Sequence, residues 1–308
     1  MTAEPTISVV MSVYNGAETL RDTVESVLSQ EGVDFEFIIV NDGSSDASAS
    51  MLDDLAAADA RIRLLHQANQ GLTKALINGC ALARGKYIAR QDCGDQSLPG
   101  RLRTQVDVMQ SRPEASLVSC GTRFVGPNQE PLYDRTLTAA EAGSGLQTLE
   151  LTQLRGPAHH GSTMFSRDLY KHAGGYREQF YFAQDIDLWT RLVEHGRHVA
   201  IPDLLYEATF ALGSISSLQR QCQIECAALI LECARLRRGG QSDSAVLSRA
   251  SQILPRAAKA SSNEMASALY FVGTCLSQRS DPRARRYYRD ALRANPLHFR
   301  SAIRLLLG

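Results

Sequence analysis

Two carboxylates lie close together directly after an apolar segment, within residues 87–102, YIARQDCGDQSLPGRL. Asp92 and Asp95 are separated only by a cysteine and by Gly94, which stands where a third acid would complete the cluster. Carboxylates at the end of a strand commonly bind a divalent cation or the hydroxyl groups of a sugar. We therefore expect a binding loop here that has two carboxylates and lacks the third.

Polar residues also follow two earlier apolar segments. Tyr14 and Asn15 come after a β-branched segment, and Asp42 comes after FEFIIV. In a parallel sheet the carboxyl ends of the strands lie at one edge, and ligands collect there. If these segments are parallel strands, Tyr14, Asp42 and Asp92 belong to a single site.

The pattern of the whole N-terminal part predicts such a sheet. Short apolar segments alternate with segments whose apolar residues have helical spacing, which is typical of a parallel sheet with helices on both faces. Strands are expected at residues 6–13, 35–40, 62–67, 86–90 and 115–125, with helices at residues 17–30 and 71–84 among those between them. We therefore predict an α/β fold in which one sheet positions the polar residues.

A change of character near residue 215 divides the chain into two parts. Residues 1–214 hold 18 Lys and Arg against 27 Asp and Glu, a net charge of −9. Residues 215–308 hold 15 against 6, a net charge of +9, and show helical spacing without a strand signal. Residues 281–307 are similar to half a tetratricopeptide repeat. We expect one large domain, 1–214, followed by a small, basic, all-α region, 215–308.

The sequence shows no sign of export or of membrane insertion. Its first residues lack the basic and long apolar segments of a signal peptide, and no apolar run approaches the roughly 18 residues of a membrane span. The seven cysteines have neither disulfide-type nor zinc-type spacing, so we expect reduced thiols. These features favour a cytoplasmic protein. Its basic C-terminal region is either a solvated helical face or a means of peripheral attachment to the anionic inner face of a membrane. Nucleic acid is not expected as a partner, because no groove-binding motif accompanies the charge.

Three segments together resemble the family-two inverting glycosyltransferases of the GT-A fold, which build bacterial polysaccharides and glycolipids. These are residues 7–30, 35–46 and 70–102, and residues 161–192 are similar to the acceptor-side segment of the family. The resemblance covers about two thirds of the chain and stops near residue 215. It implies a GT-A domain, with a Rossmann-like, mostly parallel central sheet, and an enzyme that uses a nucleotide-sugar donor.

The resemblance assigns several residues to the donor. A loop carboxylate such as Asp42 can accept the imide proton of the base, and Tyr14 can provide an aromatic surface beneath it. Donor-side positions also include Asn15, Lys74 and Arg90, with Lys74 facing either the diphosphate or solvent. Asp92 matches the acid that contacts ribose or donor sugar in the family.

Inversion at the anomeric carbon requires a base that deprotonates the acceptor hydroxyl. In the family this base is the Asp of a Glu-Asp pair, and Asp185 matches it, although Asp185 could also serve as a helix cap. Gln184 replaces the Glu of the pair, which keeps the hydrogen-bonding shape and removes a charge, and we expect it on the acceptor or phosphate side of the site. His159 and His160 precede the Gly-Ser that the family places near phosphates or acceptor, so we assign His160 to that side and leave a structural role open for both histidines.

The metal site departs from the family pattern. Gly94 stands where the metal-binding Asp is expected, and Asp95 is the only nearby acid that could join Asp92. A second departure precedes residues 213–216, GSIS, where Thr209 and Ala211 replace an Arg and a His that relatives often carry. Three alternatives follow. The enzyme holds Mg²⁺ or Mn²⁺ weakly, it works without metal by using cations from Lys74, Arg90 or the basic C-terminal part, or it is not catalytic.

The leading hypothesis is an inverting hexosyltransferase that moves a sugar from a nucleotide-diphosphate sugar, with a UDP-sugar favoured, to a saccharide or lipid-linked saccharide. The alternative is a degenerate GT-A domain that acts as a nucleotide-sugar-binding or scaffold protein. A sugar nucleotidyltransferase is disfavoured, because residues 14–16, Tyr-Asn-Gly, do not form a glycine-rich phosphate loop.

Overall fold

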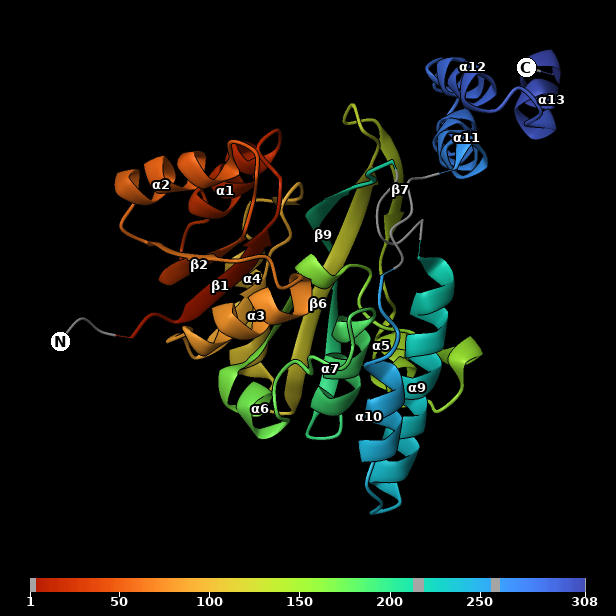
Figure 1. Cartoon of the computed structure of the whole chain (residues 1–308). Helices are drawn as coiled ribbons and strands as arrows, with labels where there is room; N and C mark the ends of the chain where they lie inside the picture. Colours follow the sequence, from red (N-terminus) through yellow and green to blue (C-terminus); the bar gives the residue numbers. More distant parts are fainter. Residues whose placement is uncertain (1–3, 213–218, 256–260, 308) are drawn as a thin grey trace. The chain divides into compact units, whose positions relative to one another are not determined.

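The fold is centred on a nine-stranded sheet with the strand order β3-β2-β1-β4-β8-β6-β9-β5, in which β7 pairs with β6 (Figure 1). The computed structural model describes residues 4–212, 219–255 and 261–307. Four strands are parallel, namely β1 (Ile7–Val13), β2 (Phe35–Asp42), β3 (Ile62–Gln67) and β4 (Tyr87–Arg90). The others are β5 (Gln96–Ser97), β6 (Ala115–Val125), β7 (Pro131–Arg135), β8 (Thr163–Ser166) and β9 (Arg197–Thr209).

The predicted α/β fold is confirmed, and its parallel strands lie where the apolar segments predicted them. The second half of the sheet is antiparallel, because β8 inserts between β4 and β6 and runs opposite to both. The chain reaches β8 only after the long segment that follows β6, so the pairing partner of β8 is set by tertiary structure and not by adjacency along the chain.

Helices connect the strands and cover the sheet. They are α1 (Leu20–Leu28), α2 (Ser48–Ala58), α3 (Leu72–Ala81), α4 (Arg101–Ser111), α5 (Ala139–Gly145), α6 (Arg167–His172) and α7 (Gln184–Leu192), with 3₁₀ turns η1 (Leu151–Gln153) and η2 (His160–Ser162). Helix α3 packs across β1 and β2. The approach is close because Gly79 faces the sheet, where an added Cβ would lie 2.8 Å from a methyl group of Val10. The close packing on the sheet therefore fixes the position of α3 and of the loop that precedes it.

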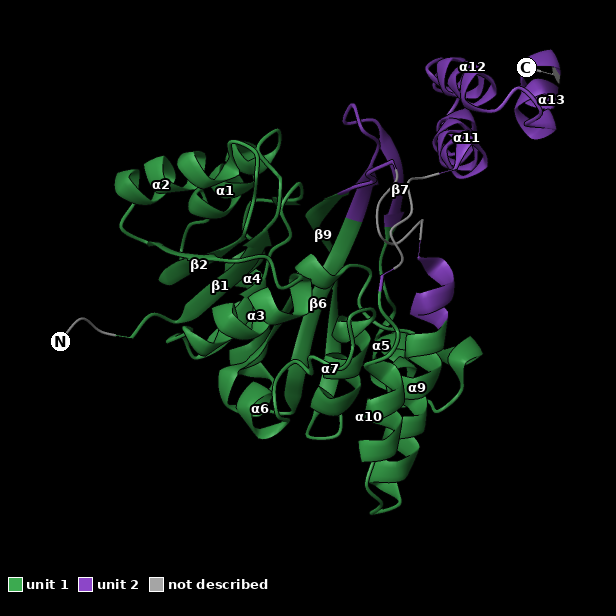
Figure 2. Ribbon diagram, viewed as in Figure 1, with its two compact units in different colours: residues 1–122, 135–208, 225–254 green, residues 123–134, 209–224, 255–308 purple. Residues whose placement is uncertain are grey.

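The chain divides into two compact units that do not follow the expected division at residue 214 (Figure 2). Unit 1 consists of residues 1–122, 135–208 and 225–254, and unit 2 consists of residues 123–134, 209–224 and 255–308. Most of α9 (Arg220–Arg238) and all of α10 (Ser244–Ala250) belong to unit 1. Within unit 1, α9 buries apolar side chains such as Leu229 and Ile230, and its Arg237 pairs with Glu194 at 2.7 Å. Two helices of the C-terminal third are therefore part of the sheet-containing unit. The GSIS segment lies outside the described residues.

Unit 2 has a small core of its own. Its helices α11 (Ser262–Gln278), α12 (Ala284–Ala294) and α13 (Phe299–Leu307) enclose a cluster that includes Leu269, Val272 and Tyr288. The β6–β7 turn joins this core through Glu130, which accepts a hydrogen bond from the hydroxyl of Tyr287 at 2.6 Å. Among the described helices, none combines the length and the apolar character that crossing a bilayer requires.

Candidate active site

Asp42 ends β2 and organises the loop that leads into α3. Its carboxylate is 2% exposed and accepts hydrogen bonds from the backbone amides of Gln70 and Gly71, both at 2.9 Å. The side-chain amide of Gln67 donates to it at 2.7 Å. Asp42 therefore lies at the predicted strand end, and three donors already hold the carboxylate in place.

Asn15 joins the loops that follow β1 and β2. Its side-chain oxygen accepts from the backbone amide of Ser45 at 2.8 Å, and its own backbone amide donates to the hydroxyl of Ser44 at 3.0 Å. Asn15 has a φ of +51°, a left-handed conformation that asparagine tolerates better than most residues. The neighbouring Tyr14 is 56% exposed, so its ring is free of the core and open to a ligand. Asn15 thus shapes the loop, and Tyr14 provides the exposed surface.

Residues before α7 approach the Asp42 loop. The ring of Tyr181 packs against Gly71, where an added Cβ would lie 3.1 Å from it. Burial and then the charge of Asp42 raise the pKa of Tyr181, which places the phenol in the electrostatic field of that carboxylate. Lys74 lies at the start of α3, and its amine is 3.4 Å from Glu178, with both side chains about half exposed. Lys74 therefore faces solvent and an acid.

Arg90, at the end of β4, lies beneath the acidic loop and not in it. The side chain has no exposed surface, and it donates to Oδ1 of Asp92 at 2.7 Å and to the carbonyl of Val10. Its Nε also lies 3.3 Å from Nε2 of His160. Because a guanidinium can only donate, that ring nitrogen is an acceptor and the imidazole is neutral. Burial first, and then Arg90, lowers the pKa of His160 to about 3.

These contacts correct two expectations. Arg90 cannot contact a nucleotide-sugar donor in this conformation, because no part of its side chain is exposed. His160 is 8% exposed, and its Nε2 lies 2.7 Å from the hydroxyl of Tyr176. His160 therefore packs against the buried side chain of Arg90 and does not face a sugar acceptor. Both predictions assumed that a residue next to a site residue in the sequence is also exposed to the ligand.

Asp92, Asp95 and His159 form the one group of possible metal ligands found among the described residues. One ligand atom from each lies within 4.8 Å of the others. Nδ1 of His159 is 3.4 Å from Oδ2 of Asp95 and 3.7 Å from Oδ2 of Asp92. Burial, the largest single influence, works against the charged form of Asp92, but Arg90 together with the neighbouring histidines and Arg101 lowers the pKa of the carboxyl. Two carboxylates and an imidazole therefore converge where the sequence predicted only two acids.

Tyr206 of β9 lies behind this group. It is fully buried, its hydroxyl donates to Oδ2 of Asp95 at 2.9 Å, and the backbone amide of Asp92 donates to it at 3.2 Å. The ring stacks on that of His159 with centroids 5.6 Å apart. The guanidinium of Arg101 also lies over the Tyr206 ring, 4.9 Å from its centroid. Tyr206 thus contacts all three members of the group.

Asp185 lies in the first turn of α7, beside the same group. The residue before the helix, Ala183, has a φ of +56°, a conformation that costs an L-residue roughly 1–2 kcal/mol and sets the direction in which α7 begins. Burial raises the pKa of Asp185, and the charge of Asp92 raises it further while His159 acts in the opposite direction. A carboxyl with a raised pKa is a stronger base than an ordinary Asp. Gln184, the first residue of the helix, is buried.

Helix α7 is anchored by buried ion pairs. Asp187 is fully buried and accepts from Arg177, with Nε at 3.0 Å from Oδ2, and from Arg191 at 2.6 Å. Arg177 also donates to Asp243, the residue before α10, at 2.7 Å. Asp187 is therefore structural, and the segment between α9 and α10 contributes to the position of Asp185.

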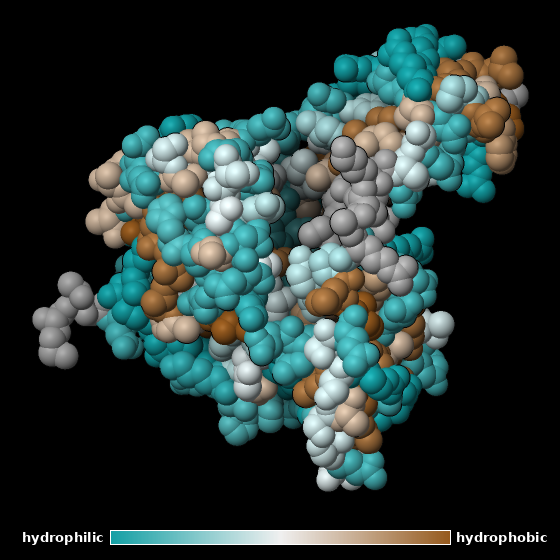
Figure 3. Space-filling view, viewed as in Figure 1, coloured by the Kyte–Doolittle hydropathy of each residue, from teal (hydrophilic) through white to brown (hydrophobic). Residues whose placement is uncertain are grey.

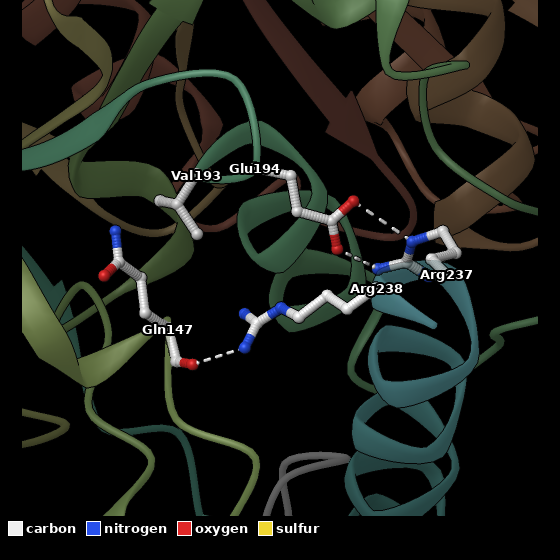
Figure 4. A pocket seen from close by; sticks show the side chains of 5 residues that line it. All are labelled: Gln147, Val193, Glu194, Arg237 and Arg238. Atoms are coloured by element: carbon white, nitrogen blue, oxygen red, sulfur yellow. Dashed lines mark hydrogen bonds and ion pairs between the residues drawn. The ribbon is translucent and has the colours of Figure 1, made fainter. Parts of the chain in front are cut away.

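A cavity of about 470 Å³ lies elsewhere in unit 1, lined by Gln147, Val193, Glu194, Arg237 and Arg238 (Figure 4). In the figure Arg238 extends across it and donates to the carbonyl of Gln147 at 2.8 Å, while Arg237 pairs with Glu194. None of its lining residues belongs to the acidic group. We place the candidate site at the acidic group and not at this cavity, because the cavity offers no converging catalytic groups.

The sequence did not single out three participants. His159 was noted only as one of a pair of histidines, and that pair next to Gly161 was the available signal. Tyr206 and Tyr181 had no signal, because each reaches the site from a distant segment.

Comparison with known proteins gives a consistent result. Residues 8–174 match the family described as Glycosyl transferase family 2. The putative glycosyltransferase EpsE of Bacillus subtilis is 29% identical over 243 residues, covering 77% of this chain and 85% of EpsE. EpsJ of the same organism, an uncharacterized glycosyltransferase, is 31% identical over 184 residues, covering 59% of this chain and 52% of EpsJ.

Solved structures show the same fold. S. aureus TarS 1–349 in complex with UDP-GlcNAc superposes with a TM-score of 0.57 at 15% identity, covering 94% of this chain and 89% of TarS. The mannosyltransferase PcManGT of Pyrobaculum calidifontis, in complex with GDP-Man and Mn²⁺, gives 0.57 at 15% identity, covering 99% of this chain and 88% of that one. These proteins share the GT-A architecture with the chain. The chain therefore belongs to glycosyl transferase family 2 and is a glycosyltransferase of the GT-A fold.

Proposed function

We propose that the protein is an inverting glycosyltransferase that moves a hexose from a nucleotide-diphosphate sugar, with a UDP-sugar favoured, to a hydroxyl of a saccharide or lipid-linked saccharide. The observation that carries the proposal is the position of Asp185. It lies on a helix anchored by buried ion pairs, within the field of Asp92, and its pKa is raised. A role in building a bacterial polysaccharide is what the resemblance to the family implies, and EpsE and EpsJ are themselves described as glycosyltransferases.

In this mechanism Asp185 takes the proton of the acceptor hydroxyl. The hydroxyl oxygen forms a bond to the anomeric carbon while the bond from that carbon to the diphosphate oxygen breaks. The nucleoside diphosphate leaves with the bonding electrons, and attack from the opposite face inverts the anomeric configuration. The residues around Asp42, together with exposed Tyr14, would bind the base of the nucleotide.

The family implies a divalent cation, and the donor set fits one. Asp92 and Asp95 offer hard oxygen ligands of the kind that Mg²⁺ and Mn²⁺ take. When bound, the cation would neutralise charge on the diphosphate leaving group. Metal-independent transfer with Arg90 and Lys74 as the cations is less favoured, because Arg90 is buried against Asp92 and Lys74 pairs with Glu178.

The test is a transfer assay with UDP-glucose, UDP-galactose, UDP-N-acetylglucosamine and GDP-mannose, with and without Mn²⁺. Products are analysed by NMR for the anomeric configuration. We expect one donor to be used, with inversion, and Asp185→Asn to reduce kcat by 10²-fold or more, on the order of the contribution of a general base. Retention of configuration, or full activity in Asp185→Asn, would overturn the mechanism. The alternative, a non-catalytic scaffold with a degenerate GT-A domain, is supported by absence of heat on titration with UDP and GDP, each in the presence of Mn²⁺.

We also propose that the protein works in the cytoplasm, attached peripherally to the inner face of an anionic membrane through α13. This helix and the residue pair before it expose Leu297 (86%), Phe299 (66%) and Leu306 (85%). Figure 3 shows apolar residues gathered at this end of unit 2. Residues 261–308 hold eight arginines against three acids, so basic residues accompany the apolar side chains.

Flotation with vesicles of phosphatidylcholine and phosphatidylserine tests this attachment. We expect binding that falls with salt and with Phe299→Ser/Leu306→Ser, while neutral vesicles bind weakly. Equal binding to both kinds of vesicle would remove the preference for anionic lipid from the proposal, and binding to neither would remove the membrane, while the transfer reaction is unaffected by either result.

A further inference from the structure

We propose that His159 supplies the ligand that Gly94 cannot, so that the cation is held by Asp92, Asp95 and an imidazole nitrogen, and that the site therefore prefers Mn²⁺ to Mg²⁺. This inference rests on the proposed function, because it concerns the cation that serves the same diphosphate leaving group. It assigns a role to a histidine of this chain that sequence analysis left open.

The geometry is close to that of a filled site. Nδ1 of His159 lies 3.4 Å from Oδ2 of Asp95 and 3.7 Å from Oδ2 of Asp92. Neighbouring ligands of an octahedral cation with bonds of about 2.1 Å are about 3 Å apart. The imidazole nitrogen therefore lies within about 0.4–0.7 Å of the spacing from each acid that a shared ion requires.

One oxygen of each acid, Oδ2, faces the imidazole. Oδ1 of Asp92 is bound by Arg90 at 2.7 Å, and its Oδ2 is the atom nearer His159. Nδ1 of His159 accepts from the backbone amide of Gly161 at 3.2 Å, a weak contact that a cation would replace. Metal binding thus exchanges one long hydrogen bond for a coordinate bond.

Tyr206 holds this arrangement from behind. Its hydroxyl donates to Oδ2 of Asp95, and its ring stacks on His159 at 5.6 Å with an interplanar angle of 23°. Groups that orient metal ligands in this way strengthen binding by fixing their direction before the ion arrives. One buried side chain therefore positions an oxygen ligand and the nitrogen ligand together.

The backbone explains why a side chain at residue 94 is not an equivalent solution. Gly94 has a φ of +97°, a conformation that L-residues rarely adopt, although a Cβ there would meet only Thr19 Oγ1 at 3.5 Å. An aspartate at this position would be strained even though space is available. The loop therefore places its ligands at residues 92 and 95, and the third ligand comes from the turn before β8.

An imidazole ligand changes the choice of metal. Sites made only of oxygen atoms suit Mg²⁺, whereas nitrogen ligands favour later divalent transition metals, and Mn²⁺ tolerates both. We therefore expect Mg²⁺ to compete poorly for the site.

The experiment measures Mn²⁺ binding by electron paramagnetic resonance, with Mn²⁺ alone and with Mn²⁺ plus UDP. Pulsed spectra are recorded on protein labelled with ¹⁵N-histidine and on unlabelled protein. The wild type is expected to bind Mn²⁺ with a directly bound histidine nitrogen, so that labelling changes the spectrum. His159→Gln is expected to lose that signal and to bind Mn²⁺ about tenfold or more weakly, with a smaller preference over Mg²⁺. The matched control is His195→Gln, which changes an exposed histidine outside the group.

Several results would overturn the ligand assignment. They are a histidine signal that persists in His159→Gln, Mn²⁺ affinity and Mg²⁺ competition unchanged in that variant, or no Mn²⁺ binding by the wild type in either condition. Circular dichroism of each variant shows whether a loss reflects unfolding, and His159→Asn, with an oxygen ligand, provides a second variant. Sugar transfer that continues in EDTA would contradict the metal and keep the proposed function, whereas failure to bind UDP would contradict the function itself.

Discussion

The guanidinium of Arg90, which has no exposed surface, donates to Oδ1 of Asp92 at 2.7 Å. The pair joins the end of β4 to the first acid of the candidate site. Arg90 is also held by the carbonyl of Val10 and by Nε2 of His160, so its position is fixed from the core side. The site is therefore built on a buried cation that orients Asp92 and keeps it ionised.

Arg90→Met should destabilise the protein strongly. It leaves the carboxylate of Asp92 without its buried partner, a change that costs about 3–5 kcal/mol. Urea denaturation measures the loss. Arg61→Met is the control, because Arg61 pairs with Asp59 at an exposed position, and such pairs contribute at most about 1 kcal/mol. Equal losses in the two variants would contradict the buried role of Arg90.

On acidification, kcat should decline at a higher pH than it would if the base were an aspartate with an ordinary pKa. Burial and Asp92 raise the pKa of Asp185 above its ordinary value of 3.8. A base is active only when deprotonated, so kcat should decline as the pH drops through this raised pKa. Because Asp92 contributes to the shift, saturation of the acidic group with Mn²⁺ should move the decline toward lower pH. A pH profile of kcat at two Mn²⁺ concentrations measures both effects. A decline of kcat centred on the ordinary aspartate pKa of 3.8 would refute the assignment of Asp185 as the base.

Asp243→Asn should weaken the anchoring of α7 without touching the substrate. Asp243 receives Arg177 at 2.7 Å and Arg237 at 3.3 Å, and hydrogen bonds to charged groups contribute about 1.5–3 kcal/mol. We expect a stability loss of about that size and a lower kcat, with the donor KM little changed, because Asp185 shares a helix with Asp187.

The matched control for this variant is Asp290→Asn, whose partners Arg286 and Arg293 are exposed on α12. It should change stability by no more than about 0.5 kcal/mol. A kcat that stays at the wild-type value in Asp243→Asn would show that the α10 contact does not position the base.

Gly161→Ala should disrupt the site. A Cβ at Gly161 would overlap the hydroxyl of Tyr206, the group that contacts Asp95 and the Asp92 amide. Tyr206 is fully buried and cannot move away cheaply, so we expect a loss of several kcal/mol or failure to fold, in line with overpacking of a core.

Gly143→Ala, in helix α5, meets nothing within 4 Å and should stabilise the protein by about 0.5–1 kcal/mol. Thermal unfolding of the two alanine variants compares them directly. If Gly161→Ala were as stable as the wild type, Tyr206 would have to be able to shift and make space for the added methyl group.

The fold was largely predictable because its signals are local. Short apolar segments identified β1, β2 and β3, and the polar residues that end them identified the edge of the sheet that holds the site. The antiparallel strand β8 carries no local sign of its partners, so its place between β4 and β6 could not be predicted. The division near residue 214 also failed to match the compact units, since charge counts do not show where α9 packs.

The sequence by itself determined the acids, the strand ends that carry them and the family to which they belong. Only the tertiary structure decided that Arg90 is buried, that His159 joins Asp92 and Asp95, and that Tyr206 stands behind all three. The reason is physical: backbone preferences and apolar periodicity act over a few residues, whereas Tyr206 is 111 positions from Asp95 and meets it only when the sheet has closed.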